Sequence, residues 1–352
     1  MELTSKKDKI QKTWVEKYRP KTIDSIVQQN EIKNLLSNAF KTKTLTHMLL
    51  HGPSGTGKTT TALTISRFFF HLTEDQYSQI KTTKPYEILN EKIMKERVLE
   101  LNASDDNKIK VVRDKIKTFA MSSIVDYEGV AKFKIIILDE ADALTSDSQF
   151  ALRRIIEKYT DSTRFILICN YVTKIIPPLA SRCMKLRFQT VSTESLDLII
   201  KRISHKENIN VSDNFVTRLN QITKGDLRES INLLERVAFI DPSLSIQTLE
   251  EISGQITGNF TDILWDCLSN PSIPMTNIIE YTVQFKNQSY SSLILLEGLF
   301  SKVLESSNLT DKDKAIIIIA ISKADYYLNE NANEYIQLVK LFGLIKVMFD
   351  SK

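Results

Sequence analysis

The sequence has few of the residues that typify metal-binding, disulfide-stabilised or membrane-spanning proteins. Its 352 residues include three cysteines and four histidines, and the cysteines form no CxxC or other metal-ligand spacing. An odd cysteine count suits a reducing compartment. The most apolar run, 315–321, is far shorter than the about 20 residues that span a bilayer, so it predicts a buried helix segment. The N-terminus lacks the apolar stretch of a signal peptide. We expect a soluble intracellular protein.

Glycine and proline are also scarce, with 9 and 8 copies, which argues against long linkers and low-complexity tails. The formal net charge is only +4, so a polyanionic partner must be met by a local basic patch rather than by the whole chain. The length exceeds one ordinary core and suggests about two or three domains.

Short apolar runs alternate with helical patterns between about 46 and 188. Strands that are apolar throughout and separated by helices predict a parallel β-sheet covered on both faces. The polar, lysine-rich segment 71–95 is expected to be an exposed loop with a short helix. The predicted strands are 47–51, 97–102, 133–139, 164–170 and 184–188.

From Ser192 onward the strand signal disappears. The segments 193–208, 212–223 and 226–240 carry apolar residues at helical spacing, and the region beyond 257 is helical again. We therefore predict three domains: an α/β domain over 1–190, a small all-α domain over 191–256 and a second all-α domain over 257–352.

The segment GPSGTGKTT begins at Gly52, directly after an apolar strand pattern and directly before a helical one. In that context it is the phosphate-binding loop GxxxxGK[ST], and an accidental glycine-rich turn is disfavoured. Its backbone N–H groups and the helix N-terminus attract phosphate oxygens. Lys58 is placed to reach the β- and γ-phosphates of ATP, and the Thr59 hydroxyl to ligate Mg²⁺. The nucleotide-binding residues predicted here are Gly52, Pro53, Ser54, Gly55, Thr56, Gly57, Lys58, Thr59 and Thr60.

Two further strand ends carry polar side chains to the carboxyl edge of the sheet, where ligands bind in α/β proteins. Asp139 is predicted to hold the Mg²⁺ with Thr59, and Glu140 to orient and deprotonate a water. Asn170, at the end of 164–170, is placed to touch the γ-phosphate or that water. A water-directed glutamate favours ATP hydrolysis over small-molecule kinase chemistry, which would need a second substrate pocket. A solvated strand end and a turn residue are the structural alternatives for the acids and the amide.

Six motifs in order carry a family resemblance from Trp14 to about Val237. They are WVEKYRP, GPSGTGKTT, ELNASDD, IIILDEAD, ICNYVTKIIPPLASRC and KGDLRESINLL. The chain closely resembles the small subunits of replication factor C, the eukaryotic sliding-clamp loader and an AAA+ ATPase. The fifth motif is most similar to the small subunit in the fourth position of the pentamer, and the C-terminal region matches more loosely around 333–338.

The resemblance implies a P-loop NTPase of the AAA+ class, followed by an all-α lid over 191–256 and an all-α collar over 257–352 that serves oligomerisation. It places Arg228 as a second sensor arginine that reaches the phosphates, and further residues around the adenine. The adenine wall implied in this way is Val15, Tyr18, Arg19, Pro20, Ile26, Val27 and Gln28.

Arg182 acquires a role only through the resemblance. The Ser-Arg-Cys motif of the family presents an arginine finger to the nucleotide of the neighbouring subunit, so Arg182 is expected to act in trans. Such an arginine stabilises charge on the γ-phosphoryl and accelerates hydrolysis by about 10³–10⁵. The alternative is a structural salt bridge.

Two helices are implied to follow the phosphates of primer–template duplex DNA without reading its sequence. The first carries a basic stripe and begins near Ser104 or Asp105; Asn107 and Lys108 replace the arginine-glycine pair usual in the family. The second follows a Ser146–Gln149 capping-box pattern. An ordinary solvated face is the alternative for both. The predicted contacts are Lys108, Lys110, Arg113, Lys117, Gln149, Arg153 and Arg154.

Ile109, Val112, Ile116 and Phe119 form the apolar stripe of the first helix. In the family, the far end of this helix meets the sliding clamp (PCNA), so Met121 is a possible clamp contact, whereas Phe119 is expected in the core.

The expected function is that of a subunit of the heteropentameric clamp loader, which uses ATP and Mg²⁺ to load the clamp on DNA during replication and repair in the nucleus. Three alternatives stay open: an ATP-binding scaffold with dispensable hydrolysis, a subunit shared with a checkpoint or cohesion loader, and a different AAA+ machine.

Overall fold

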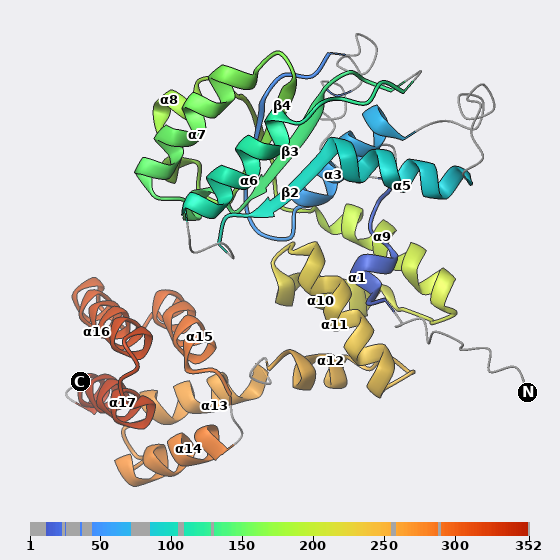
Figure 1. The fold of residues 1–352 in the computed structure, drawn as a ribbon. Coiled ribbons are helices and arrows are strands. Elements are labelled where there is room, and N and C mark those ends of the chain that lie inside the picture. The colour runs from blue at the N-terminus through green and yellow to red at the C-terminus, as the bar shows by residue number, and fades with distance from the viewer. Residues whose placement is uncertain are drawn as a thin grey trace, which may run out of the picture. The chain divides into compact units, whose positions relative to one another are not determined.

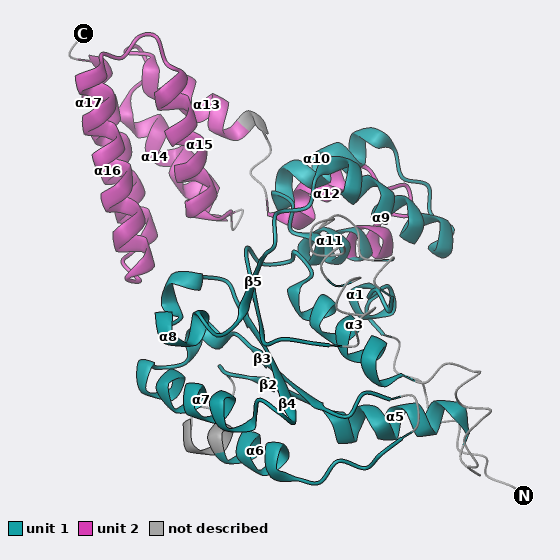
Figure 2. Ribbon diagram, turned by 90° about the horizontal axis from the view of Figure 1, so that it is seen from above, with its two compact units in different colours: residues 1–235 teal, residues 236–352 magenta. Residues whose placement is uncertain are grey.

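A computed structural model describes residues 12–22, 25, 36, 44–71, 85–104, 109–127, 130–254, 258–287 and 290–350; for 109–113 and 258–259 it describes the backbone alone. Two compact units divide the chain, residues 1–235 and residues 236–352 (Figure 2), and the division falls within a helix. The predicted three-domain boundaries stay a prediction, since the first unit holds the sheet together with most of the predicted lid.

The first unit is built on a five-stranded sheet of order β2-β3-β4-β1-β5, in which all neighbours are parallel (Figure 1). Each predicted strand is confirmed to within one residue at either end. Apolar runs produce the central strands β3, β4 and β1 because both faces of the sheet are covered there, whereas the edge strands β2 and β5 are more exposed. The strands are β1 (Met48–His51), β2 (Val98–Asn102), β3 (Lys134–Asp139), β4 (Thr163–Cys169) and β5 (Met184–Arg187).

Alternate residues of the strands enter two different cores. Leu50, Ile135 and Ile166 belong to a cluster that includes side chains of α3 (Lys58–Phe70) and α5 (Tyr86–Arg97). Their neighbours along the strands belong to a second cluster on the other face, with α6 (Ile109–Met121), α7 (Ser146–Tyr159) and the short α8 (Pro177–Ala180). The predicted P-loop NTPase layering is therefore present, with the sheet between two helical layers.

The segment 71–95 departs from its predicted character. Helix α5 is 12 residues long, and Leu89 and Ile93 bury one side of it against the sheet core. The i, i+4 spacing of these two residues is enough to pack the helix although it carries many charges. Residues 72–84 lie outside the described part of the chain.

The predicted lid begins with three capped helices. Ser192 accepts a hydrogen bond from the Ser195 N–H at the start of α9 (Thr193–Glu207), and Ser212 does the same for the Phe215 N–H at the start of α10 (Asp213–Thr223). α11 (Leu227–Ile240) follows. Apolar residues at helical spacing, such as Leu196, Ile200 and Ile203, are buried.

The second unit consists of helices in its described residues. Its core gathers Leu268, Phe285, Leu299 and Phe342 with further aliphatic residues. The run 315–321 was predicted to be buried, but only one side of it is: Ile317 is fully covered and Ile319 is exposed, as the helical period requires. The helices are α12 (Ile246–Ser253), α13 (Gly258–Ser269), α14 (Met275–Asn287), α15 (Ser292–Glu305), α16 (Asp311–Asn329) and α17 (Glu334–Asp350).

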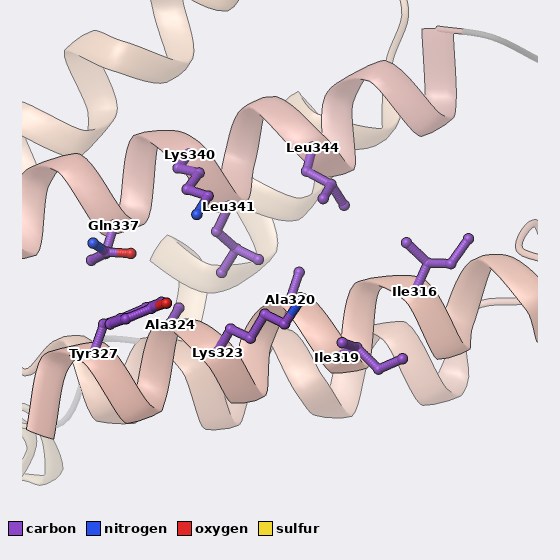
Figure 3. A pocket seen from close by; sticks show the side chains of 10 residues that line it. All are labelled: Ile316, Ile319, Ala320, Lys323, Ala324, Tyr327, Gln337, Lys340, Leu341 and Leu344. Carbon is purple, nitrogen blue, oxygen red and sulfur yellow. The ribbon is translucent and has the colours of Figure 1, made fainter.

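A hollow between α16 and α17 is lined mainly by apolar side chains, with Tyr327 and the ammonium groups of Lys323 and Lys340 among them (Figure 3). Lys340 Nζ lies 5.9 Å from the centre of the Tyr327 ring. The residues that line this hollow include no carboxylate. Among the described helices, none combines the length and the apolar character needed to cross a bilayer.

Each unit also buries a lysine. Lys134, 1% exposed, donates to the carbonyl oxygens of Phe119 and Ser122 at the end of α6. Lys346, 4% exposed, donates to the carbonyl oxygen of Asn270. Burial lowers the pKa of Lys134, and the nearby Arg97 guanidinium lowers it further. Lys346 also forms an ion pair with Asp350 at 3.2 Å, and Lys134 also donates to the Ser122 hydroxyl oxygen. Protein oxygens therefore satisfy these cations in place of water.

Candidate active site

The phosphate-binding loop connects β1 to α3 at the carboxyl edge of the sheet. Gly55 and Gly57 have φ angles of 66° and 89°, a left-handed backbone that glycine adopts without strain. A Cβ atom on Gly55 would lie 1.8 Å from a carboxylate oxygen of Asp226. Asp226 also accepts a hydrogen bond from the Glu229 N–H, at 3.0 Å, and so caps α11. The loop therefore packs against the end of the helix that carries Arg228.

The Lys58 ammonium lies buried inside the loop, with 7% of the residue exposed. Its Nζ donates to the carbonyl oxygens of Gly52 and Pro53 at 2.8 and 2.7 Å and to Asn170 Oδ1 at 2.9 Å. Burial lowers the pKa of Lys58, and the Asp139 carboxylate opposes that shift. The bond to Asn170 brings the ends of the neighbouring strands β1 and β4 together beside the loop.

Thr59 and Asp139 meet at the end of β3. The Thr59 hydroxyl donates to Asp139 Oδ2 at 2.6 Å. Hydroxyl and carboxylate oxygens are hard ligands, and Mg²⁺ in nucleotide sites takes only one or two protein ligands besides water and phosphate oxygens. The residues present therefore fit the predicted cation.

Glu140 occupies the junction between β3 and the 3-10 turn η1 (Ala141–Ala143). Its φ of 52° is uncommon outside glycine, and its N–H donates to Asp139 Oδ1 at 2.9 Å. This left-handed residue ends the strand, so the carboxylates of Asp139 and Glu140 do not continue the alternation of a strand. One strand end can thus supply both a cation ligand and a separate base.

Asp142 was not singled out from the sequence, although it is the third acid of the same motif. Its Oδ2 accepts hydrogen bonds from the backbone N–H groups of Asn170 and Tyr171, at 3.2 and 3.1 Å. Asp142 therefore fixes the backbone at the end of β4. The signal that was available is a third carboxylate three residues after Asp139.

Four parts of the first unit line one pocket: the segment 14–20, which we call the N-terminal strap, the phosphate loop, the strand ends and the lid helices. The predicted residues that it brings together are Val15, Tyr18, Arg19, Pro20, Ser54, Gly55, Thr56, Gly57, Lys58, Thr59, Thr60, Asp139, Glu140, Asn170 and Arg228.

Other predicted residues lie elsewhere. Gly52 and Pro53 line an adjoining hollow beside Asn170, and 26–28 lie outside the described residues. The pocket also has lining residues that the sequence reasoning missed, mostly apolar side chains of the lid, which could not be told from ordinary core positions. They are Ser25, Val191, Ile199, Arg202, Ile203, Leu227 and Ile231.

Arg182 lies just after α8 and does not line its own chain's pocket. Its guanidinium donates to the Pro178 carbonyl oxygen at 2.7 Å and forms an ion pair with Glu157 of α7. Glu157 also accepts a hydrogen bond from Arg153 Nε at 3.1 Å. The hydrogen bond from Arg153 is the main cause that holds the pKa of Glu157 below its usual range, and the charge of Arg182 adds to it. One partly exposed carboxylate thus holds both arginines.

The predicted DNA contacts fall into three groups. Lys117 of α6 and Arg154 of α7 are exposed, and Arg153 is half-buried. Lys110 and Arg113 lie on α6, with only their backbone described, and Lys108 lies outside the described residues. Ser104 directly precedes the same gap and Asp105 falls in it, so the predicted cap of α6 lies outside the described residues.

Gln149 corrects two predictions. Its side chain is buried, with 1% of the residue exposed, and Nε2 donates to the carbonyl oxygens of Leu144 and Lys174, both at 3.0 Å. Its Oε1 accepts from the Ile176 N–H at 2.8 Å. The amide is saturated by the protein, so the predicted DNA contact is wrong. The capping box with Ser146 is wrong as well, because Thr145 caps α7 by accepting from the Ser148 N–H.

At the end of α6, Phe119 is half-buried and packs against a core cluster, as expected. Met121 is 62% exposed. Ile116 of the predicted apolar stripe is buried, and the side chains of 109 and 112 are not described.

Comparison with known proteins adds two family models and many relatives. Residues 28–192 match the family described as DNA polymerase III, delta subunit, and residues 260–343 match the replication factor C C-terminal domain. Replication factor C subunit 2 of Schizosaccharomyces pombe is 36% identical over 340 residues, which cover 95% of this chain and 94% of that protein. Replication factor C subunit 4 of Homo sapiens is 36% identical, over 94% of this chain and 87% of its own length.

The similarity also extends to archaea. The replication factor C small subunit of Methanococcus vannielii is 35% identical over 96% of this chain and 100% of that protein. Among solved structures, the RuvB Holliday junction branch migration motor of Thermotoga maritima aligns with a TM-score of 0.51 and 18% identity, over 80% of this chain and 92% of its own. At that identity the likeness concerns the fold alone.

Proposed function

This chain belongs to the replication factor C small-subunit family, the clamp-loader subunits of DNA replication, and from that premise we propose how its nucleotide site works. The fold is that of an AAA+ ATPase, a nucleotide-binding protein that functions in a multi-subunit complex. The proposal concerns the role of each residue, the partners and the source of the catalytic arginine.

Within the pocket, Lys58, Asn170 and Arg228 bind the phosphates, and the N-terminal strap walls the adenine. Thr59 and Asp139 hold Mg²⁺, which neutralises phosphate charge when it is bound. Glu140 orients the attacking water and accepts its proton. Support comes from the contacts of Lys58 with Asn170 and of Thr59 with Asp139, because they bring three sequence-distant motifs to one point.

The catalytic site is completed by a neighbour. The observation that carries this proposal is that Arg182 lies outside its own chain's pocket while the phosphate, cation and water-directed residues lie inside it. Arg182 therefore serves the γ-phosphate of the adjacent subunit in a heteropentamer. This chain's own ATP receives the arginine of its other neighbour.

ATP binding, in this proposal, lets the subunits grip an open sliding clamp (PCNA) and primer–template DNA, and hydrolysis releases the clamp closed around the DNA. Met121 at the end of α6 is the candidate clamp contact. Among the residues whose side chains are described, the candidate contacts to DNA phosphates are Lys117, Arg153 and Arg154. Lys110 and Arg113 share the helix of Lys117, and Lys108 precedes it. The eukaryotic relatives support a nuclear location.

The test is a reconstituted complex with Arg182→Ala in this subunit alone. We expect DNA-stimulated hydrolysis at the neighbouring site to fall by about 10³-fold, because the finger is lost, while ATP binding by the altered subunit is unchanged. Arg182→Lys serves as the control that keeps the charge but loses the fork of donors. The isolated wild-type chain should bind ATP and hydrolyse it slowly; rapid turnover by the monomer would contradict the split site.

A companion variant, Glu140→Gln in this subunit, distinguishes the loader from a scaffold. A motor subunit loses clamp loading while it still binds ATP, whereas unchanged loading would identify a scaffold whose hydrolysis is dispensable. Mass spectrometry of the complex purified from cells identifies the large subunit, and so separates the replication loader from a checkpoint or cohesion loader.

A further inference from the structure

The N-terminal strap is joined to two lid helices by side-chain contacts. The backbone N–H of Trp14 donates to Glu235 Oε2 of α11 at 3.0 Å. Lys17 Nζ donates to Glu207 Oε1, at the last residue of α9, at 2.6 Å, and the Tyr18 hydroxyl donates to the same oxygen. These contacts lie within the first unit, where α1 (Trp14–Lys17) lies beside α9 and α11 (Figure 1).

Tyr18 is the residue that these contacts fix most firmly. Besides the hydrogen bond of its hydroxyl, the ring centre lies 5.3 Å from the Lys17 ammonium and 5.6 Å from the Lys206 ammonium. Cations at that distance are attracted to the face of an aromatic ring. A carboxylate at the hydroxyl and two ammonium groups near the ring therefore restrict both ends of the side chain.

The titration behaviour of the pair agrees with this geometry. Burial opposes ionisation of the Glu207 carboxyl, but the hydrogen bonds from Lys17 and Tyr18 outweigh it and lower its pKa. Burial, and then the bond to Glu207, raise the pKa of Tyr18. The phenol thus stays a donor and the carboxylate a charged acceptor over the same pH range.

The strap and the lid helices line the same pocket. Val15, Tyr18, Arg19 and Pro20 line it from the strap, and α9 and α11 line it with residues that include Ile203 and Arg228. The phosphate loop supplies the polar end of the same pocket. Contacts that fix the strap on the lid therefore hold two walls of this pocket together.

We propose that Glu207 is a positioning residue for the base of the bound nucleotide: it holds Tyr18 against lid helix α9 and so closes the base end of the pocket, with Glu235 as a second attachment. The proposal rests on the ATP site described above and deepens it. Glu207 touches no part of the nucleotide in this role. Its effect passes through Tyr18, and it concerns base binding rather than phosphate binding.

Glu207→Ala in the full-length chain tests the proposal by comparing two ligands in the presence of Mg²⁺. We expect the dissociation constant for a ribose-labelled fluorescent ATP to rise about tenfold, since a charge-assisted hydrogen bond is lost. The dissociation constant for inorganic tripolyphosphate, measured by calorimetry, should change less than about twofold, and discrimination of ATP against GTP should weaken.

Two comparisons separate positioning from simple destabilisation. Tyr18→Phe should reproduce the loss of ATP affinity, and the double variant should lose no more than either single one, because both act through one contact. Asp197→Ala is the matched control on α9, since it removes an exposed ion pair with Lys201, at 2.8 Å, and should leave both affinities unchanged.

Equal loss of ATP and tripolyphosphate affinity by Glu207→Ala would show general damage and overturn the positioning role. Unchanged ATP affinity would overturn it too. Neither affinity measurement involves a clamp, DNA or a neighbouring subunit. The clamp-loading proposal can therefore fail on its own: the assembled complex would not load a clamp, while the chain would still discriminate ATP from GTP.

Discussion

At the scale of single residues, the nucleotide site depends on groups that hold others in place. Asp142 fixes the backbone after β4, Asp226 caps the helix that carries Arg228, and Gln149 joins the start of α7 to the segment before α8. These side chains are acceptors for backbone N–H groups or donors to carbonyl oxygens near strand and helix ends. Their removal should change geometry more than ligand contacts.

Asp142→Ala gives a direct measure of that distinction. We expect kcat for ATP hydrolysis in the assembled complex to fall about tenfold, because the backbone N–H groups of Asn170 and Tyr171 lose the acceptor that sets the position of Asn170, and ATP affinity to change little. Asp147→Ala, an exposed acid in the first turn of α7, is the control. A loss of affinity as large as the loss of kcat would mean that Asp142 supports binding in general.

The catalytic candidates could be predicted because their positions follow from a general rule: polar residues directly after buried parallel strands gather at one edge. Asp139 and Asn170 follow this rule, Lys58 follows from the phosphate-loop motif, and the three lie together. Gln149 and Glu207 could not be predicted. Both are polar residues in helices, and the sequence does not show whether such a side chain faces solvent or a partner distant in the chain.

At the scale of elements, the strands were predictable and one helix was not. Continuous apolar runs such as 135–138 leave few alternatives to a buried strand. Helix α5 was predicted only as a short helix in an exposed segment, because its many charges hid the narrow apolar side that Leu89 and Ile93 bury. The cap of α7 was misplaced by one residue, because Thr145 and Ser146 are both good capping residues.

A titratable side chain, that of His47, lies just before β1 and bonds to the backbone of the neighbouring strand β4. His47 is buried, and its Nδ1 accepts the Phe165 N–H at 3.2 Å, which requires a neutral imidazole. Burial, and then the charge of Arg164, lower the pKa of His47 from 6.5 to about 4. The unfolded chain therefore binds a proton at a higher pH than the folded one does. Stability from this site is present above pH 6.5 and is lost as the pH falls toward 4.

We expect the free energy of unfolding to fall by roughly 3 kcal/mol from this group between those pH values. His47→Asn keeps an acceptor for the Phe165 N–H without the titration, so its stability should depend less on pH over that interval. Urea unfolding at several pH values measures the difference, with His205→Asn at an exposed position of α9 as the control. Parallel pH curves for wild type and His47→Asn would contradict the assignment.

At the scale of the whole molecule, the net charge of +4 is too small to attract a polyanionic partner by itself. The chain carries 47 Lys and Arg against 43 Asp and Glu. The proposed attraction to DNA therefore needs a local basic patch, for which Lys117, Arg153 and Arg154 are the candidates with described side chains. Such attraction is made to phosphates and weakens as salt is added.

In the assembled complex, Lys117→Ala and Arg154→Ala should each reduce the slope of log affinity against log salt by about 0.9 on primer–template DNA, since each removes one phosphate contact. Gln149→Ala should leave the slope unchanged because that side chain is buried. Lys132→Ala, in the segment before β3 and paired with Asp126, is the control. Equal slopes for all four variants and the wild type would show that α6 and α7 do not contact the DNA phosphates through these residues.

Lys134 and Lys346, two buried lysines that lie outside the nucleotide pocket, give each unit its own chemical reporter. An amine-directed acylating reagent modifies exposed lysines in the folded chain, but it reaches Lys134 only when the sheet unit opens and Lys346 only when the C-terminal helices part. Labelling followed by peptide mass spectrometry would therefore follow the opening of the two units separately in one sample, without engineered labels. It would also reveal whether assembly protects one unit more than the other.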